Sequence, residues 1–167
     1  MLTSVAASLY EVVLAVHIMA VVVAFGVTFA YPIMFAVAAR HDPRGLPLLH
    51  RVEYSVERML INPALLLVLL AGIYLASKGH YWSDFFVQWG LAAVVLIGGL
   101  VGSVMIPTAK RAEQAAARDL AAAGGEGDGV AMSDEYRTLV RRSSLVGTLI
   151  SVLVLVTILF MALHIGA

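Results

Sequence analysis

Four long stretches of the chain contain no Asp, Glu, Lys or Arg. They run from Val12 to Ala39, from Met59 to Ser77, from Phe85 to Ala109 and from Ser143 to Ala167. Each reaches or exceeds the roughly 18 apolar residues that cross about 30 Å of hydrocarbon as a helix. The pattern therefore predicts four membrane-spanning helices, over about residues 10–39, 58–78, 84–109 and 143–165, within a single domain of residues 1–167.

The polar connections carry turn and helix signals of their own. Residues 41–45 contain Pro43 and Gly45 and predict a turn. Residues 46–58 interleave apolar and charged positions, which predicts an interfacial helix that leads into the second span. The third helix is expected to continue past Pro107 to Ala123 and to end at the glycines of 124–129. Ser133, followed by two acidic residues, is expected to cap the helix that enters the fourth span.

The basic residues indicate the orientation. Ten of the eleven Lys and Arg lie in the first and third connections, and only Lys78 lies in the second. Because positive residues resist translocation, the two basic connections are expected in the cytoplasm and both termini outside.

Composition agrees with this interpretation. The chain is 61% hydrophobic and 13% charged, with no net charge and no cysteine, whereas soluble domains are about 45–50% apolar and about 25% charged. A neutral chain has no basic patch for nucleic acid, and without cysteine it has no disulfide or iron–sulfur ligand. The predicted fold class is all-α: an integral membrane antiparallel four-helix bundle, N-out and C-out, with amphipathic cytoplasmic helical extensions.

Small residues predict how the helices pack, because helices in lipid associate through close backbone approach. Gly98 and Gly102 lie four residues apart on the third span, and Ser144 and Thr148 do so on the fourth. Pro32 and Pro63 are expected to bend the first and second helices.

Only His17 is an ionisable residue clearly within a span, which makes it the main functional candidate. It lies about 9 Å from the outer edge at 1.5 Å per residue. One interpretation is a neutral imidazole hydrogen-bonded to a neighbouring helix. The other is a ligand of haem or a metal, with Met161 or His164 as the second cofactor ligand, or with His17 as the sole axial ligand.

Polar residues also gather at both ends of the predicted bundle. At the outer end, His80, Asp84 and His164 could join His17 in a divalent metal site, although Tyr81 and Trp82 there are typical of an aromatic belt. At the inner end, Glu53, Glu57 and Arg58 are candidates for proton handling. The alternative is that an interfacial helix leaves all three in solvent.

Two segments carry a resemblance to known families. Residues 14–20, LAVHIMA, and residues 56–64, VERMLINPA, followed by Gly-Ile-Tyr-Leu at 72–75, resemble an uncharacterised family of four-span bacterial integral membrane proteins. More distantly, they are similar to the haem-binding four-span protoporphyrinogen oxidase and to copper-resistance membrane proteins of the D type. The resemblance implies a multi-pass protein of the bacterial cytoplasmic membrane that binds haem b through His17.

In that oxidase, the resemblance implies a functional pair of a first-helix His and a third-helix Lys. His17 matches the first position, but the third span contains no Lys, so the oxidase activity is not expected here. Two hypotheses remain: a haem- or metal-binding membrane protein that uses His17, and a cofactor-free structural or accessory subunit that forms a homo-oligomer or joins a larger complex.

Overall fold

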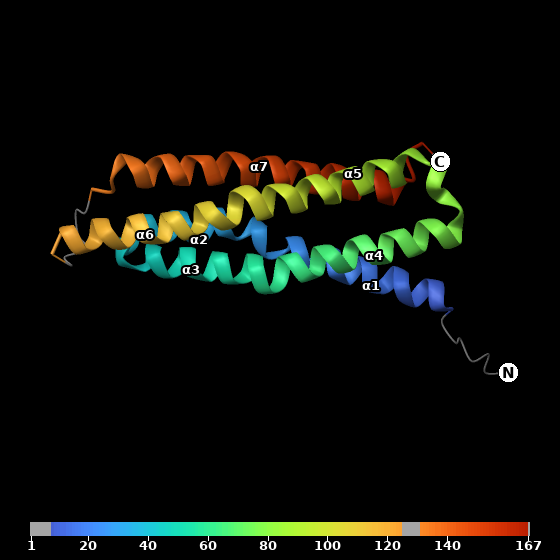
Figure 1. The fold of residues 1–167 in the computed structure, drawn as a ribbon, viewed down its shortest axis with the longest axis horizontal. Helices are drawn as coiled ribbons and strands as arrows, with labels where there is room; N and C mark the ends of the chain where they lie inside the picture. The colour runs from blue at the N-terminus through green and yellow to red at the C-terminus, as the bar shows by residue number, and fades with distance from the viewer. Residues whose placement is uncertain (1–7, 125–130, 167) are drawn as a thin grey trace.

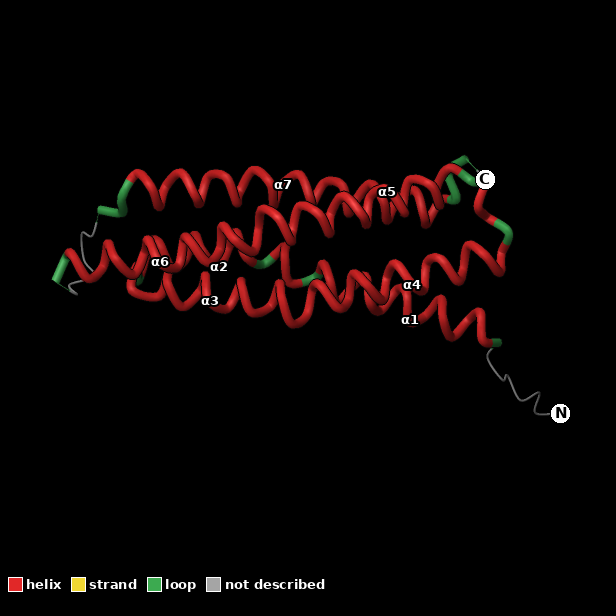
Figure 2. The backbone as a smooth tube through the Cα atoms, viewed as in Figure 1, coloured by secondary structure: helices red, strands yellow, loops and turns green. Residues whose placement is uncertain are grey.

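The computed structural model describes residues 8–124 and 131–166, and in this part of the chain the secondary structure is entirely helical. The chain runs back and forth along the long axis of an elongated molecule (Figure 1). Long helices are joined by short turns (Figure 2). We call the end that carries α2, α3 and α6 the polar end. The opposite end, where both described chain ends lie, is the terminal end.

The first long helical segment is broken near its middle. Helix α1 spans Leu9–Phe25, a short 3₁₀ turn η1 spans Val27–Phe29, and α2 spans Tyr31–His41. Ser8 opens α1 with a capping box, in which its hydroxyl accepts from the Glu11 amide and the Glu11 carboxylate accepts from the Ser8 amide. Pro32 lies in the first turn of α2, where its missing N–H costs no hydrogen bond. The break lies at residues 26–30, just before the predicted proline bend.

The second and third segments are longer, and a π-turn interrupts each. After the 3₁₀ turn η2 (Pro43–Gly45), the second comprises α3 (Leu46–Val56), the π-turn η3 (Glu57–Ile61) and α4 (Asn62–Gly79). The 3₁₀ turn η4 (Tyr81–Ser83) leads to the third, which comprises α5 (Phe85–Leu100), the π-turn η5 (Val101–Met105) and α6 (Ile106–Ala122). Each π-turn is followed by a proline in the first turn of the next helix. The glycines predicted to end α6 at 125–129 lie outside the described residues, and Gly124 follows its last turn with a φ of 71°.

The fourth segment is the single helix α7 (Asp134–Leu163), and Ser133 caps it as predicted. Counted as continuous segments, four helices are long and apolar enough to cross a membrane: Leu9–His41, Pro43–Gly79, Phe85–Ala122 and Asp134–Leu163. The structure thus confirms that the four predicted spans are helical and that the third helix extends past Pro107. It also confirms the turn at residues 41–45, where the Asp42 carboxylate accepts from the Arg44 amide.

Two cores hold the helices together. The central core joins all four segments through buried residues that include Phe25, Ile61, Ile97 and Val154. The second core lies at the polar end, where small alanines of α6 let α3, α6 and α7 approach closely. Its buried members are Leu46, Ala112, Ala115, Ala116 and Tyr136.

The outward faces of the helices are strongly apolar. Met59 is 77% exposed, and Ile33, Leu66, Val95 and Leu145 also point away from the protein interior. Exposed apolar surface on this scale is covered by lipid or by another protein in a stable state.

One packing expectation from the sequence is corrected by the structure. A Cβ placed on Gly98 or Gly102 would meet nothing within 4 Å, so these small residues do not form close contacts between helices of the chain.

The predicted helix at 46–58 is present as α3, continues through η3 into α4 as expected, and packs along α6. Leu46, His50 and Glu53 form its buried face, whereas Leu48 and Val52 are exposed.

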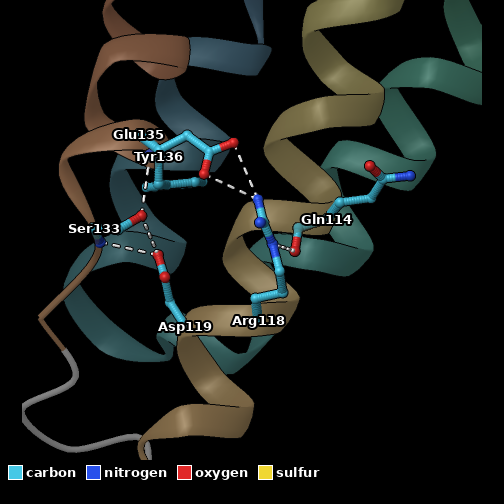
Figure 3. Close-up of polar contacts among 6 residues, drawn as sticks. All are labelled: Gln114, Arg118, Asp119, Ser133, Glu135 and Tyr136. Atoms are coloured by element: carbon cyan, nitrogen blue, oxygen red, sulfur yellow. Dashed lines mark hydrogen bonds and ion pairs between the residues drawn. The ribbon is translucent and has the colours of Figure 1, made fainter.

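A polar clasp fastens α6 to the start of α7 (Figure 3). The Asp119 carboxylate accepts from both the amide and the hydroxyl of Ser133 at 2.9 Å, and Arg118 donates to both carboxylate oxygens of Glu135 at 3.0 Å. The ion pair is exposed and contributes little by itself. Ser133 is shared between the clasp and the cap of α7, so the clasp also positions the first turn of α7, which contains Tyr136.

Replacing the capping serine should therefore loosen the polar end. We expect Ser133→Ala to lower the free energy of unfolding by about 1 kcal/mol, because the α7 cap and the hydroxyl contact to Asp119 are both lost, while the amide contact to Asp119 remains. Denaturant titration of the detergent-solubilised protein measures this. Thr138→Ala, an exposed change on the same helix, should cost less than about 0.5 kcal/mol. Equal effects of the two substitutions would contradict the role of the clasp.

Candidate functional site

His17 lies on α1 where that helix packs along α4. Its Nδ1 atom is 3.1 Å from the main-chain oxygen of Val68, and the contact fits a proton on Nδ1 that is donated to this carbonyl. The ring is half-buried, and the edge that carries Cε1 lies over Gly72, which has no side chain to obstruct it. With Nδ1 occupied in this way, the lone pair of Nε2 is left for a ligand. The same hydrogen bond also satisfies the structural interpretation, a neutral imidazole bound to a neighbouring helix.

The two proposed partner ligands of His17 lie on α7 or at its end and contact α5. The methyl group of Met161 sits directly against Gly90, where any side chain would collide with it. His164 ends α7 in the left-handed conformation with a φ of 48°, and its ring meets the Phe86 ring edge-on at 5.2 Å. Among the hydrogen bonds and ring contacts of residues 8–124 and 131–166, none joins His17 to either residue.

The metal candidates at the terminal end have structural roles there. His80 ends α4 with a φ of 59°, and Asp84 precedes α5 as its N-cap residue. In the described part of the chain, no group of three or more His, Cys, Asp or Glu is arranged to hold a metal ion. The set of His17, His80, Asp84 and His164 therefore stays a prediction from composition.

Aromatic rings dominate the terminal end. Phe85 and Trp89 both pack against Phe160, and the Trp89 indole donates to the Thr157 hydroxyl at 3.0 Å. These contacts fasten α5 to α7 near the predicted outer surface. Tyr81 and Phe86 extend the group toward the end of α4.

The polar end holds a second cluster, and it is far more buried than the sequence suggested. His50 stands between two partners: its Nδ1 is 3.0 Å from Glu53 Oε2, and its Nε2 is 3.2 Å from the Tyr136 hydroxyl. Both contacts fit the tautomer with the proton on Nδ1, which donates to Glu53 while Nε2 accepts from Tyr136. The Phe35 ring covers the imidazole at 4.5 Å. A histidine and a carboxylate on α3 are thereby linked to a tyrosine on α7.

Two further polar groups in this region are buried without a partner. Glu57 is 3% exposed and Tyr31 is 9% exposed, and neither Glu57 Oε2 nor the Tyr31 hydroxyl makes a hydrogen bond within the described chain. Unpartnered buried polar atoms are uncommon in native proteins, and each calls for a physical reason. Glu57 is also the first residue of the π-turn η3.

Electrostatics at the polar end favour protonated side chains. Glu57 lies outside the charge-free segment of residues 59–77, and burial together with the neighbouring Glu53 carboxylate raises its pKa to about 8. Tyr136 lies outside the charge-free segment of α7, and burial, Glu53 and Asp119 raise its pKa to about 12. At neutral pH, therefore, Glu57 carries a proton in most molecules.

The alternative in which an interfacial helix leaves Glu53 and Glu57 in solvent is wrong, because both residues are buried, whereas Arg58 is exposed. The spacing of His50, Glu53 and Glu57 puts all three on one face of a helix. This spacing is the sequence feature that indicates a shared polar cluster. The partner residue Tyr136 lies 86 positions from His50, and no local pattern predicts that contact.

Comparison of the chain with protein-family models, with curated proteins and with solved structures finds no match. The family resemblance drawn from residues 14–20 and 56–64 accordingly stays a prediction.

Proposed function

We propose that the chain is a multi-pass integral protein of the bacterial cytoplasmic membrane. In this proposal, the four long helices form an antiparallel bundle in the lipid bilayer, with both termini outside and the polar end in the cytoplasm. The apolar outward faces support the insertion, and the concentration of Lys and Arg in two connections supports the orientation.

Cysteine labelling tests the orientation, because the chain has no cysteine of its own. Ser83→Cys, exposed in η4, should react with a membrane-impermeant maleimide added to intact cells. Ala117→Cys, exposed on α6, should react only after the cells are lysed. The reverse pattern would overturn the proposed orientation.

We further propose that the protein binds haem b through His17 and serves in electron transfer or tetrapyrrole handling. The observation that carries this proposal is the hydrogen bond from His17 Nδ1 to the Val68 carbonyl. Histidines that bind metals almost always donate their other ring N–H to such an acceptor, which fixes the ring and increases its basicity as a ligand. Met161 and His164 are the candidates for the second ligand, and axial ligation by His17 alone is the alternative. Bound haem would supply a one-electron centre.

The haem proposal has a direct spectroscopic test. Detergent-purified protein mixed with haem should show a Soret band, and His17→Ala should reduce that band to the background of free haem. His80→Ala, which changes another histidine, should leave the band unchanged. Met161→Leu should shift the band if the thioether is a ligand and should not affect it if His17 binds alone. A protein that takes up no haem would refute the proposal.

A second candidate function is a cofactor-free subunit of a homo-oligomer or of a larger membrane complex. One observation favours it: Gly98, Gly99 and Gly102 on α5 and η5 face open space. Small residues at this spacing allow close approach of another membrane helix. In that case, the glycine face is the contact surface with another chain rather than with a helix of the same chain.

Substitution of the glycine face tests the second candidate function, in which this face is the contact surface with another chain. Gly102→Leu should dissociate an oligomer that packs through this face, because Leu blocks close backbone approach. Val95→Leu, an exposed apolar change on α5, should leave the oligomer intact. Size-exclusion chromatography with light scattering measures both. If Gly102→Leu leaves the mass of the complex unchanged, this face is not its interface.

A further inference from the structure

A chain of acid–base groups leads from the protein surface at the polar end toward Glu57. A surface cavity of about 500 Å³ lies between the ends of α2 and α3 and the first half of α7, and Tyr136, Arg137 and Arg141 line part of it. From Tyr136, the chain continues to His50 Nε2 at 3.2 Å and from His50 Nδ1 to Glu53 at 3.0 Å. A tyrosine hydroxyl and an imidazole can each give one proton and accept another.

Glu57 stands one helical turn beyond Glu53 on the same face of the helix. The groups that face it are Glu53 from α3, which acts on it electrostatically, and the Tyr31 hydroxyl from the start of α2. The nearest basic residue in sequence, Arg58, is exposed and donates instead to Tyr54. On α6, the buried polar residue is the uncharged Thr108. Among the ion pairs of the described residues, none involves Glu57.

The chemistry of the cluster selects a proton as its ligand. A metal ion needs several converging donors, and the described residues contain no such group of His, Cys, Asp and Glu. A buried carboxyl with one free oxygen needs only a single proton to become neutral, and neutrality is what its apolar surroundings favour.

We propose that Glu57 is a proton-binding site, loaded from the cavity at the polar end through Tyr136, His50 and Glu53. An acid in the cavity gives a proton to the Tyr136 oxygen, and the Tyr136 hydroxyl proton passes to His50 Nε2. The His50 Nδ1 proton passes to Glu53, and from Glu53 it passes to Glu57. The net change is one proton lost by the acid in the cavity and one gained by the Glu57 carboxylate, and no electron moves.

The site also lies where the helix backbone is irregular. Glu57 opens the π-turn η3, and π-turns interrupt the regular hydrogen bonding of a helix and are frequent at functional sites. A change of charge on Glu57 therefore acts at the junction of α3 and α4. This proposal is independent of haem binding, because His17 lies on α1 and bonds to Val68 of α4, and its hydrogen bond does not involve the His50–Glu53–Tyr136 cluster.

Carbodiimide labelling tests the site itself, because dicyclohexylcarbodiimide reacts with protonated carboxyl groups in apolar surroundings. Wild-type protein in detergent should be labelled on Glu57 at about pH 6 and not at about pH 10, with a midpoint near pH 8. Mass spectrometry of peptides locates the label. Glu57→Gln should lose it, and Glu135→Gln, which changes an exposed carboxylate, should keep it. Folded protein without label on Glu57 at pH 6 would overturn the proposal.

The route is tested by the rate of protonation. After a rapid drop in pH, the infrared carbonyl band of the Glu57 acid should grow several-fold more slowly in Tyr136→Phe, because this change removes one hydroxyl and keeps the ring packed. Tyr54→Phe removes a hydroxyl from the outer side of the same α3 and should leave the rate unchanged. Because both variants retain Glu57, the final size of the band should match wild type. Equal rates in wild type and Tyr136→Phe would overturn the route through His50.

Discussion

The cost of burying a polar group determines the arrangement of the polar end. His50 and Glu53 lie on the face of α3 that packs against other helices, and each is less than 5% exposed. Removing the partner of a buried charged group costs about 3–5 kcal/mol, so Glu53 depends on the imidazole beside it and the imidazole depends on Tyr136. Asp119 and Ser133 hold the start of α7 against α6, and Tyr136 on this first turn of α7 reaches His50. Hydrogen bonds thus connect α6, α7 and α3, from Asp119 through Ser133 and Tyr136 to His50 and Glu53.

The helices pack through different kinds of residues at the two ends of the molecule. At the terminal end, rings of Phe85, Trp89 and Phe160 fill the space between α5 and α7, and the indole donates to Thr157. At the polar end, alanines of α6 allow close packing around the His50 network. The contact of Phe85, Trp89 and Phe160 contains no ionisable side chain, whereas the contact of α3 with α7 at the polar end contains His50, Glu53 and Tyr136. Proton chemistry is therefore expected where the helices extend beyond their charge-free segments.

The helices were predictable from the sequence, but their contacts were not. Runs without charge are local features, as are the Ser133 cap and the turn at Pro43, and the structure confirms all of them. The amphipathic pattern of residues 46–58 left open whether Glu53 and Glu57 are solvated, because their burial depends on helices that are distant in sequence, such as α6. The glycine spacing indicated close packing but could not tell whether the neighbour belongs to the same chain, and Gly98 and Gly102 face open space. Likewise, His17 was predictable as a buried histidine, whereas its acceptor Val68 was not.

His17 and Glu57 differ in what their burial costs, and this difference indicates which of the few buried polar residues needs a functional explanation. His17 is half-buried and has one backbone partner for its ring, so its burial costs little and is compatible with a purely structural role. Glu57 has an oxygen without a partner, a carboxylate nearby and almost no exposure, and an aliphatic residue at this position would avoid all three costs. Packing alone therefore gives no reason for a carboxyl group at this position. A group that must gain and lose a proton does give such a reason, because raising the pKa of a carboxyl toward neutrality requires the burial and the neighbouring charge that make Glu57 costly.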